Sequence, residues 1–169
     1  MDRFIDGDAR AFDLLFARHG RTLRAYLHRL VGSAAVADDL TQATFISVVR
    51  GRGRFQRGAR VKPWLYAIAN NASRDWRRRN KFEAVTDEGE LPETEAEPAL
   101  QRDPGLEKAV KAALAQLPEA QREAIVLNRF EGLSFAEIAL HAGVTESAVK
   151  VRAHRGYERL RELLKGIWP

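Results

Sequence analysis

Residues 131–156 read EGLSFAEIALHAGVTESAVKVRAHRG, and this stretch decides the fold of the second half of the chain. Ser134 and Glu137 have the spacing of a capping box, in which two side chains accept hydrogen bonds from free backbone amides at the start of a helix. Gly143 then predicts a tight turn, and Thr145 predicts the N-cap of a further helix. A short helix, a glycine turn and a second helix together predict a helix-turn-helix.

The second of these helices has a buried stripe and a basic side. Apolar or small residues recur at helical spacing from Val149 to Leu163, and no acid occurs between Ser147 and Tyr157. Lys and Arg side chains can donate to guanine O6 and N7 or neutralise phosphates. The alternative is an ordinary helical hairpin with a solvated basic face. DNA binding is the better hypothesis, and its candidate residues are Lys150, Val151, Arg152, His154 and Arg155.

The rest of the chain also shows only helical periodicity, so we expect an all-α fold. Asp8 and Ser33 predict the N-caps of two helices, the second of which runs to about Val49. Glycines at 51, 53 and 58 predict a loop, and Pro63 predicts the first turn of a third helix. Two further helices are expected after the Asp-Pro pair at 103–104 and the Leu-Pro pair at 117–118, the second ending at Gly132.

The net charge of +5 is divided very unevenly along the chain. Residues 50–81 contain eleven Arg and Lys and one acid, whereas residues 82–105 contain eight acids and one Arg. The acidic stretch has few apolar residues, and Pro92 and Pro98 would break an acidic helix, which is the alternative to a flexible linker. We therefore predict two small helical domains, 1–81 and 106–169, joined by an acidic linker at 82–105.

The basic block predicts a surface for single-stranded DNA. On a helical projection of residues 63–79, Trp64 and Trp76 share one side with Leu65 and Ala69, while Tyr66 and Asn70 fall on the other side with the arginines. Cations beside aromatic and amide groups suit a strand with unpaired bases, although the Trp rings themselves are more simply explained as core. The candidate residues of the loop and helix are Phe55, Arg57, Arg60, Lys62, Asn71, Arg74, Arg77 and Arg78.

The helix expected after Ser33 has two stripes where a surface helix needs one. The first is apolar and contains Leu40 and Val48. The second mixes polar and aliphatic groups, which implies either a partner helix or a second internal contact, and periodicity leaves both open. Its residues are Asp39, Gln42, Ile46 and Val49.

Several classes of function are disfavoured by what the sequence lacks. There is no cysteine, which excludes disulfides, thiol catalysis and cysteine-based metal sites. The four histidines lack metal-ligand spacing, and neither a catalytic triad pattern nor a phosphate-binding glycine loop occurs, so an enzyme such as a nuclease is disfavoured. No signal sequence or stretch of about 18 apolar residues occurs. We expect a cytoplasmic protein without catalysis, cofactor, metal, membrane insertion or small-molecule substrate.

Three segments, in this order, resemble those of bacterial extracytoplasmic-function (ECF) sigma factors. Residues 38–45, DDLTQATF, are similar to the segment that binds core RNA polymerase. Phe55 followed by PWLYAIANN at 63–71 is similar to the segment that melts and reads the −10 promoter element. The Leu-Pro pair at 117–118, the Arg-Glu pair at 122–123 and EGLSFAEIA at 131–139 are similar to the −35-reading domain.

The resemblance implies that the chain binds core polymerase and directs it to promoter DNA. The stripe that begins at Asp39 would dock on the clamp helices of the β′ subunit, with the β subunit as a further partner. The loop ending at Lys62 would hold a flipped −10 base near Asn71, and the last helix would face the −35 element. An anti-sigma factor that covers both domains is also implied.

The sequence departs from the family pattern at Ala43, which removes a carboxylate from the core-binding segment, and in the expected recognition helix at residues 146–149, Ala153, Gly156 and Tyr157. The alternative is a stand-alone helix-turn-helix regulator. That hypothesis explains residues 106–169 but gives no reason for the basic block or for the second stripe.

Overall fold

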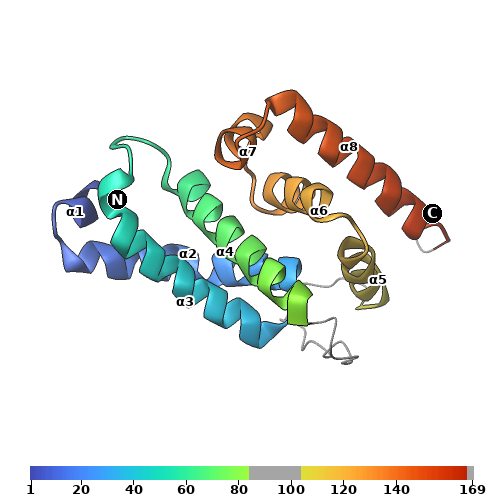
Figure 1. Ribbon diagram of the computed structural model, residues 1–169, viewed down its shortest axis with the longest axis horizontal. Coiled ribbons are helices and arrows are strands. Elements are labelled where there is room, and N and C mark those ends of the chain that lie inside the picture. The colour runs from blue at the N-terminus through green and yellow to red at the C-terminus, as the bar shows by residue number, and fades with distance from the viewer. Residues whose placement is uncertain (84–103, 167–169) are drawn as a thin grey trace. The chain divides into compact units, whose positions relative to one another are not determined.

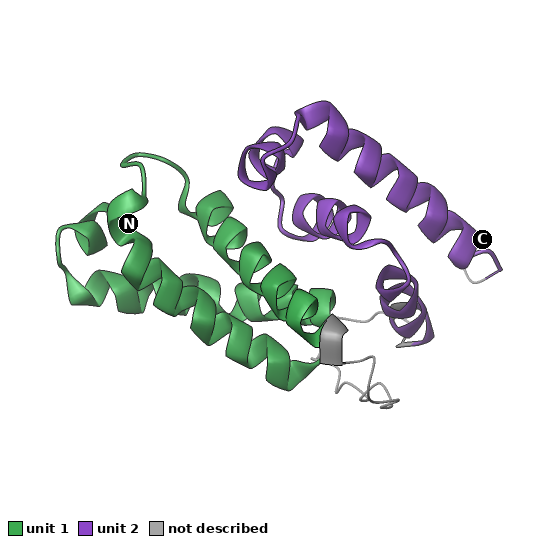
Figure 2. Ribbon diagram, viewed as in Figure 1, with its two compact units in different colours: residues 1–92 green, residues 93–169 purple. Residues whose placement is uncertain are grey.

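The computed structural model describes residues 1–83 and 104–166, and all regular elements of these residues are helical, as the periodicity predicts. The chain divides into two compact units, residues 1–92 and 93–169 (Figure 2). Helix α4 continues to Glu83 and α5 begins at Pro104, so residues 84–103 of the expected linker lie outside the described residues. Among the described residues, no helix is both long and apolar enough to cross a membrane.

Unit 1 is a bundle in which α2, α3 and α4 pack on one another, and α1 lies at the end of the bundle where α3 leads into the following loop (Figure 1). The 3₁₀ turn η1 follows α3 directly and contacts α1. The bundle core contains Leu23, Leu27, Leu30, Val48 and Leu65, each at most 1% exposed. The elements are α1 Asp2–Ile5, α2 Ala9–Val31, α3 Ala34–Gly51, η1 Arg52–Arg54 and α4 Val61–Glu83.

The two predicted caps start the long helices of unit 1. Asp8 Oδ1 accepts a hydrogen bond from the Arg10 amide at 3.0 Å, and Ser33 Oγ accepts one from the Val36 amide at 3.4 Å. Gly32 ends α2 with a φ of 80°, a left-handed conformation that glycine adopts without steric cost. Because these signals are local, they set the helix boundaries without help from the rest of the fold.

The sequence projection of α4 is wrong for two residues. Tyr66 and Asn70, which were placed on the arginine side, are buried with Leu65 and Ala69, whereas Trp64 is only half-buried. The Tyr26 hydroxyl lies 3.2 Å from Asn70 Oδ1, and the Tyr26 and Tyr66 rings are 4.9 Å apart. The hydrogen bond from α2 makes burial of the amide tolerable, so the buried arc of α4 includes polar positions.

Unit 2 is a smaller bundle in which α6 and α7 both pack against α8. Its core includes Leu114, Leu117 and Ile125, with Val110 and Leu160 packed at the edge. The helix opened by Pro118 does not run uniformly to Gly132, because it changes at Val126 to a π-helical turn. The elements are α5 Pro104–Ala115, α6 Glu119–Ile125, the π-helical turn η2 Val126–Phe130, α7 Phe135–Ala142 and α8 Glu146–Leu163.

The helix-turn-helix forms as predicted. Ser134 Oγ accepts from the Glu137 amide at 3.2 Å, and Glu137 Oε2 accepts from the Ser134 amide at 2.9 Å, which completes the capping box. Gly143 ends α7 with a φ of 65°, and Thr145 Oγ1 caps α8 by accepting from the Ala148 amide at 3.1 Å. The local signals of residues 131–149 therefore fix α7, the turn and the start of α8.

Candidate protein-binding and nucleic-acid interfaces

The second stripe of α3 is exposed. Ile46 is 51% exposed and Val49 is 41% exposed, while Leu40 and Val48 of the first stripe face the core. Asp39 and Gln42 are exposed beside the two aliphatic residues. Most of this stripe is therefore not covered by other described residues of unit 1, and only its Val49 end borders the N-terminal segment. Exposed aliphatic side chains beside polar ones on one helix side are the composition of a protein-binding surface.

Polar residues of α3 beside the stripe form hydrogen bonds to α2 and within α3 itself. The Arg24 guanidinium on α2 donates to both carboxylate oxygens of Asp38, with Nε–Oδ1 at 2.5 Å and Nη2–Oδ2 at 3.3 Å. These hydrogen bonds lower the pKa of Asp38 below its usual value. The buried Thr44 hydroxyl donates to the Leu40 carbonyl at 2.6 Å. Asp38 thus joins α3 to α2, and Asp39 remains as the exposed acid of the adjacent pair.

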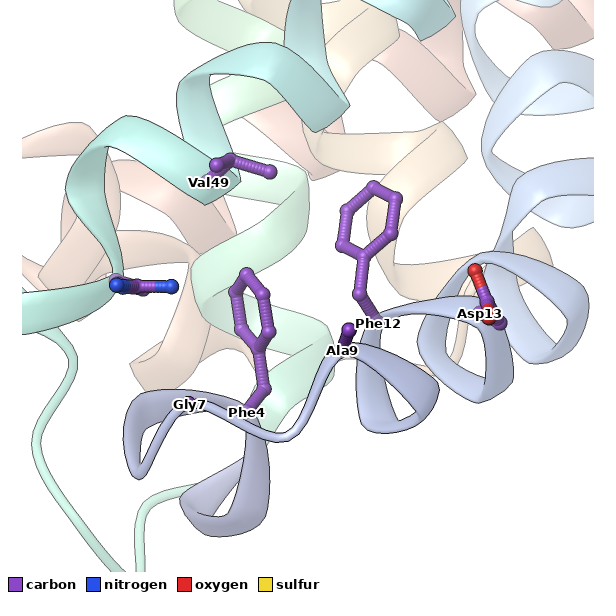
Figure 3. A pocket seen from close by; sticks show the side chains of 7 residues that line it. Phe4, Gly7, Ala9, Phe12, Asp13 and Val49 are labelled. Carbon is purple, nitrogen blue, oxygen red and sulfur yellow. The ribbon is translucent and has the colours of Figure 1, made fainter.

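A pocket that the sequence did not predict adjoins the stripe. It has a volume of about 300 Å³, and Figure 3 shows the Phe4 and Phe12 rings pointing toward α3, where Val49 lies. The two rings pack on each other, with centroids 5.5 Å apart, across the chain segment that holds the Asp8 cap. The lining residues are Phe4, Gly7, Ala9, Phe12, Asp13, Val49 and Arg52.

The loop between α3 and α4 has one buried anchor and an exposed tip. Phe55 is 6% exposed, and its ring meets the Trp64 ring edge-on with centroids 5.1 Å apart. Residues 56–60 are exposed, and Gly58 has a φ of 77°. Phe55 therefore packs inside unit 1, although the sequence proposed it for DNA contact. The cations of the loop, and not its aromatic ring, are the side chains that a nucleic acid could meet.

Arg57 at the loop tip is bonded to the N-terminal segment. Its Nη2 lies 2.5 Å from Asp6 Oδ1, and its Nη1 lies 3.3 Å from Asp6 Oδ2. The hydrogen bonds lower the pKa of the Asp6 carboxyl and raise that of the Arg57 guanidinium. The role of Asp6 could not be predicted from the sequence, because no local pattern joins two residues that are 51 positions apart. Lys62 is placed differently, with its Nζ 5.4 Å from the centroid of the Tyr66 ring.

Helix α4 carries its candidate DNA residues on the side away from the core. Asn71, Arg74 and Arg78 have the spacing of one helix side, with Asn71 and Arg78 exposed and Arg74 half-buried. Arg78 Nη2 lies 3.0 Å from Asp75 Oδ1. Arg77 is half-buried at the edge of the core, and its Nη2 donates to Ser73 Oγ at 3.3 Å. The structure thus groups three of the four predicted residues and separates Arg77 from them.

Helix α8 also separates its core side from its candidate DNA side. Val149 and Ala153 are buried, whereas Lys150, His154 and Arg155 are exposed. Val151 is exposed with the cations, and Arg152 is half-buried at the side. Two acids that the sequence analysis did not assign lie along this surface: Glu146 is 2.7 Å from Lys150 Nζ, and Glu158 is 3.4 Å from His154 Nε2. Both acids are one helical turn from their partners, a spacing that predicts such pairs.

In the part of the chain that the structure describes, no group of three His, Cys, Asp or Glu side chains could hold a metal ion. Of the four histidines, His19 and His141 lie partly inside their units, and burial lowers the pKa of both.

Comparison with known proteins identifies both units. Residues 15–83 match the family model of Sigma-70 region 2, and residues 107–160 match that of Sigma-70 region 4. The chain is 47% identical over 165 residues to the RNA polymerase sigma factor CarQ of Myxococcus xanthus, covering 97% of this chain and 95% of that one. It is 37% identical over 162 residues to the ECF RNA polymerase sigma factor SigM of Mycobacterium tuberculosis, covering 95% and 80% of the two chains.

Solved structures agree with these matches. The sigma factor RpoE from Bartonella quintana, in complex with the anti-sigma factor NepR, has a TM-score of 0.80 at 29% identity, covering 94% of this chain and 99% of that one. CnrH, in complex with the cytosolic domain of CnrY, has a TM-score of 0.73 at 27% identity, covering 97% and 94%.

A helical unit of the region 2 type followed by a helix-turn-helix unit of the region 4 type defines a sigma factor. The chain belongs to the ECF family of RNA polymerase sigma factors. It binds core RNA polymerase and directs it to promoters for transcription initiation by recognising the −35 and −10 elements.

Proposed function

We propose that this sigma factor divides its work among three surfaces. The stripe of α3 binds core polymerase, the loop after α3 and the outer side of α4 bind the −10 element, and the outer side of α8 binds the −35 element. The observation that carries the proposal is the exposure of Ile46 and Val49 on a helix whose other side already forms the core. The first domain would comprise residues 1–81 and the second residues 106–169, with the acidic linker between them.

The α3 stripe has the composition of a helix-docking surface. Two aliphatic side chains are flanked by the carboxylate of Asp39 and the amide of Gln42, so apolar contact can supply affinity while the polar groups set the register of the partner helix. The clamp helices of the polymerase β′ subunit are the proposed partner. The β subunit is proposed as the partner of the second domain.

The −10 surface combines exposed or half-buried cations with an exposed amide. Arg60, Lys62, Arg74 and Arg78 would bind phosphates of a separated strand, and Asn71 would meet a base. Arg77 would contribute from the edge of the core, where its guanidinium already contacts Ser73. Phe55 would keep the loop attached to α4 through Trp64, because its ring is buried.

The −35 surface is the exposed side of α8. Lys150, Val151, His154 and Arg155 lie on the side away from Val149, so they would enter the major groove together. Arg152, at the side of this surface, would bind a flanking phosphate. The acids Glu146 and Glu158 hold two of these side chains before DNA arrives.

Control by an anti-sigma factor is proposed from the neighbouring structures, since RpoE and CnrH were both solved with a second protein bound, which for RpoE is named as an anti-sigma factor. We further propose that the chain acts in the bacterial cytoplasm as a binding subunit, without catalysis or cofactor. A stand-alone helix-turn-helix regulator is disfavoured, because residues 15–83 match region 2 and would have no role in it.

The test is binding of labelled full-length chain to purified core polymerase. Asp39→Ala with Ile46→Ala is expected to weaken the complex, because both substitutions remove contacts at the α3 stripe. Leu14→Ala is the matched control, since Leu14 is a 63% exposed aliphatic residue on the neighbouring helix. Unchanged binding by the α3 variant, or equal loss in the control, would place the polymerase surface elsewhere. Transcription from genomic promoter fragments then checks that the complex initiates.

A further inference from the structure

The N-terminal segment of unit 1, residues 1–8, contacts the loop between α3 and α4 at two points. Asp6 holds the Arg57 guanidinium through two hydrogen bonds, at 2.5 and 3.3 Å. The guanidinium carbon of Arg52 lies 5.6 Å from the centroid of the Phe4 ring, within the range of a cation–π contact. Arg52 begins η1 and Arg57 lies at the loop tip, so the two contacts hold both ends of the stretch from 52 to 57.

The N-terminal segment is itself attached to the bundle. Phe4 is 5% exposed and packs on Phe12 of α2, and Phe12 meets Phe45 of α3 with ring centroids 6.0 Å apart. Asp8 caps α2 and also binds Arg3, with Nη2–Oδ2 at 2.7 Å. The carboxylate of Asp6 is therefore presented from a segment that Phe4 attaches to the core of unit 1.

The loop tip is exposed to solvent. Phe55 is anchored on Trp64, but residues 56–60 are exposed, and within the tip the Ala59 amide donates to the Gln56 carbonyl at 3.1 Å. A loop with exposed backbone and little buried apolar area opens at low free-energy cost. The Asp6–Arg57 pair thus ties the tip to the bundle end formed by α1.

We propose that Asp6 and Arg57 form a positioning pair that preorganises the loop for the −10 element, and that Arg57 acts through this pair and not as a phosphate ligand. The inference rests on the proposed assignment of the loop to the −10 element. A guanidinium with two hydrogen bonds to a carboxylate carries little net charge to the DNA, and a phosphate would have to displace Asp6. Ordering the loop beforehand lowers the entropy lost when a base binds.

The opposite role, in which Asp6 masks a DNA-binding Arg57, predicts effects of the opposite sign. If the pair positions the loop, Asp6→Asn weakens binding to the −10 element. The double variant in which the charges are swapped, Asp6→Arg with Arg57→Asp, then recovers part of the affinity that Arg57→Asp alone loses. If Asp6 masks a phosphate ligand, Asp6→Asn strengthens binding and the swap restores nothing. Glu162→Gln is the matched control, because it removes a similar exposed pair with Arg159 in unit 2.

The first measurement is hydrogen exchange of the free full-length chain. Asp6→Asn and Arg57→Asp are expected to speed exchange of amides 55–60, with no change in the buried amides of α2 to α4, and the swap is expected to restore protection. This measurement does not depend on DNA. Unchanged exchange in the loop would overturn the inference.

The second measurement is binding of holoenzyme to promoter fragments whose −10 non-template strand is single-stranded and varied at one base. Asp6→Asn is expected to lower affinity for the preferred base about threefold to fivefold, as fits an exposed ion pair, with less effect on the other bases. The salt dependence stays unchanged, because no phosphate contact is lost. A uniform loss in Arg57→Asp, with a salt slope smaller by about one and no rescue by the swap, would overturn the inference.

Lys62→Ala and Arg60→Ala separate failure of the inference from failure of the −10 assignment. If these variants weaken binding to the fragments while Asp6→Asn leaves discrimination unchanged, the positioning pair is refuted and the assignment stands. If all of them leave binding and discrimination unchanged, the assignment is refuted and the inference falls with it.

Discussion

Gly156 of α8 lies directly against Ile125 of α6. A β-carbon on Gly156 would be 2.6 Å from Ile125 Cδ1 and 3.3 Å from Gln121 Cβ, so the two helices approach each other at the one residue that has no side chain. Ile125 is 2% exposed, which leaves its terminal methyl little room to move. The glycine costs about 1 kcal/mol in helix propensity relative to alanine, but it permits this close packing.

Gly156→Ala is therefore expected to destabilise the protein despite the higher helix propensity of alanine. Overpacking costs about 1–3 kcal/mol, which exceeds the gain from propensity. In an Ile125→Val background the clashing methyl is absent, and the same substitution should become neutral or stabilising. Urea unfolding of the original protein, the two single variants and the double variant measures both effects. A more stable Gly156→Ala in the original background would show that α6 and α8 can separate without cost.

Tyr26→Phe is expected to destabilise unit 1 by about 1–2 kcal/mol, because it removes the hydroxyl that donates to the buried Asn70 side chain. Asn70→Ala should cost a similar amount or more, and the double variant should cost less than the sum of the two. A double-mutant cycle by thermal or urea unfolding measures the difference. Additive effects would mean that the two side chains do not stabilise each other.

The pH dependence of stability should reveal the Arg24–Asp38 pair. Hydrogen bonding to Arg24 lowers the pKa of Asp38 in the folded state, so Asp38 stabilises the fold above its unfolded pKa of about 4. This contribution is lost as pH falls through the lower, folded value. The stability difference between the protein and Asp38→Asn should thus be full at pH 7 and shrink below about pH 4.

Urea unfolding at several pH values measures this difference. The control is the same comparison in an Arg24→Met background, in which Asp38 has lost its partner and the pH dependence of the difference should be reduced. An unchanged dependence in that background would assign the lowered pKa of Asp38 to another group.

Arg155→Ala tests base recognition by α8. If Arg155 contacts a base, its loss should cost about 1–3 kcal/mol on the preferred −35 sequence and relax the preference at one position. Arg159→Ala is the control, because Arg159 lies about one turn further along and is paired with Glu162 at 2.9 Å. Binding of holoenzyme to −35 variants gives the answer, and a uniform loss across all sequences would assign Arg155 to a phosphate.

Much of the fold could be predicted because its signals are local. The capping box of Ser134 and Glu137 and the N-caps at Asp8 and Ser33 each depend on a few neighbouring residues, and the structure confirms all of them. The two stripes of α3 were predictable for the same reason, since helix periodicity alone separates Leu40 from Ile46. Whether the second stripe is exposed to solvent or covered by another helix could be decided only from the packing of the helix bundle.

The sequence by itself determined an all-α chain, its main helix caps, its uneven charge and its resemblance to sigma factors. Only the tertiary structure decided which polar residues enter the core, where the Tyr26 hydroxyl donates a hydrogen bond to Asn70. It also decided that Gly156 of α8 packs directly against Ile125 of α6. It alone joined Asp6 to Arg57 across 51 positions. Caps and periodicity act within one or two turns of chain, whereas these relationships depend on how separate helices pack, which no single segment encodes.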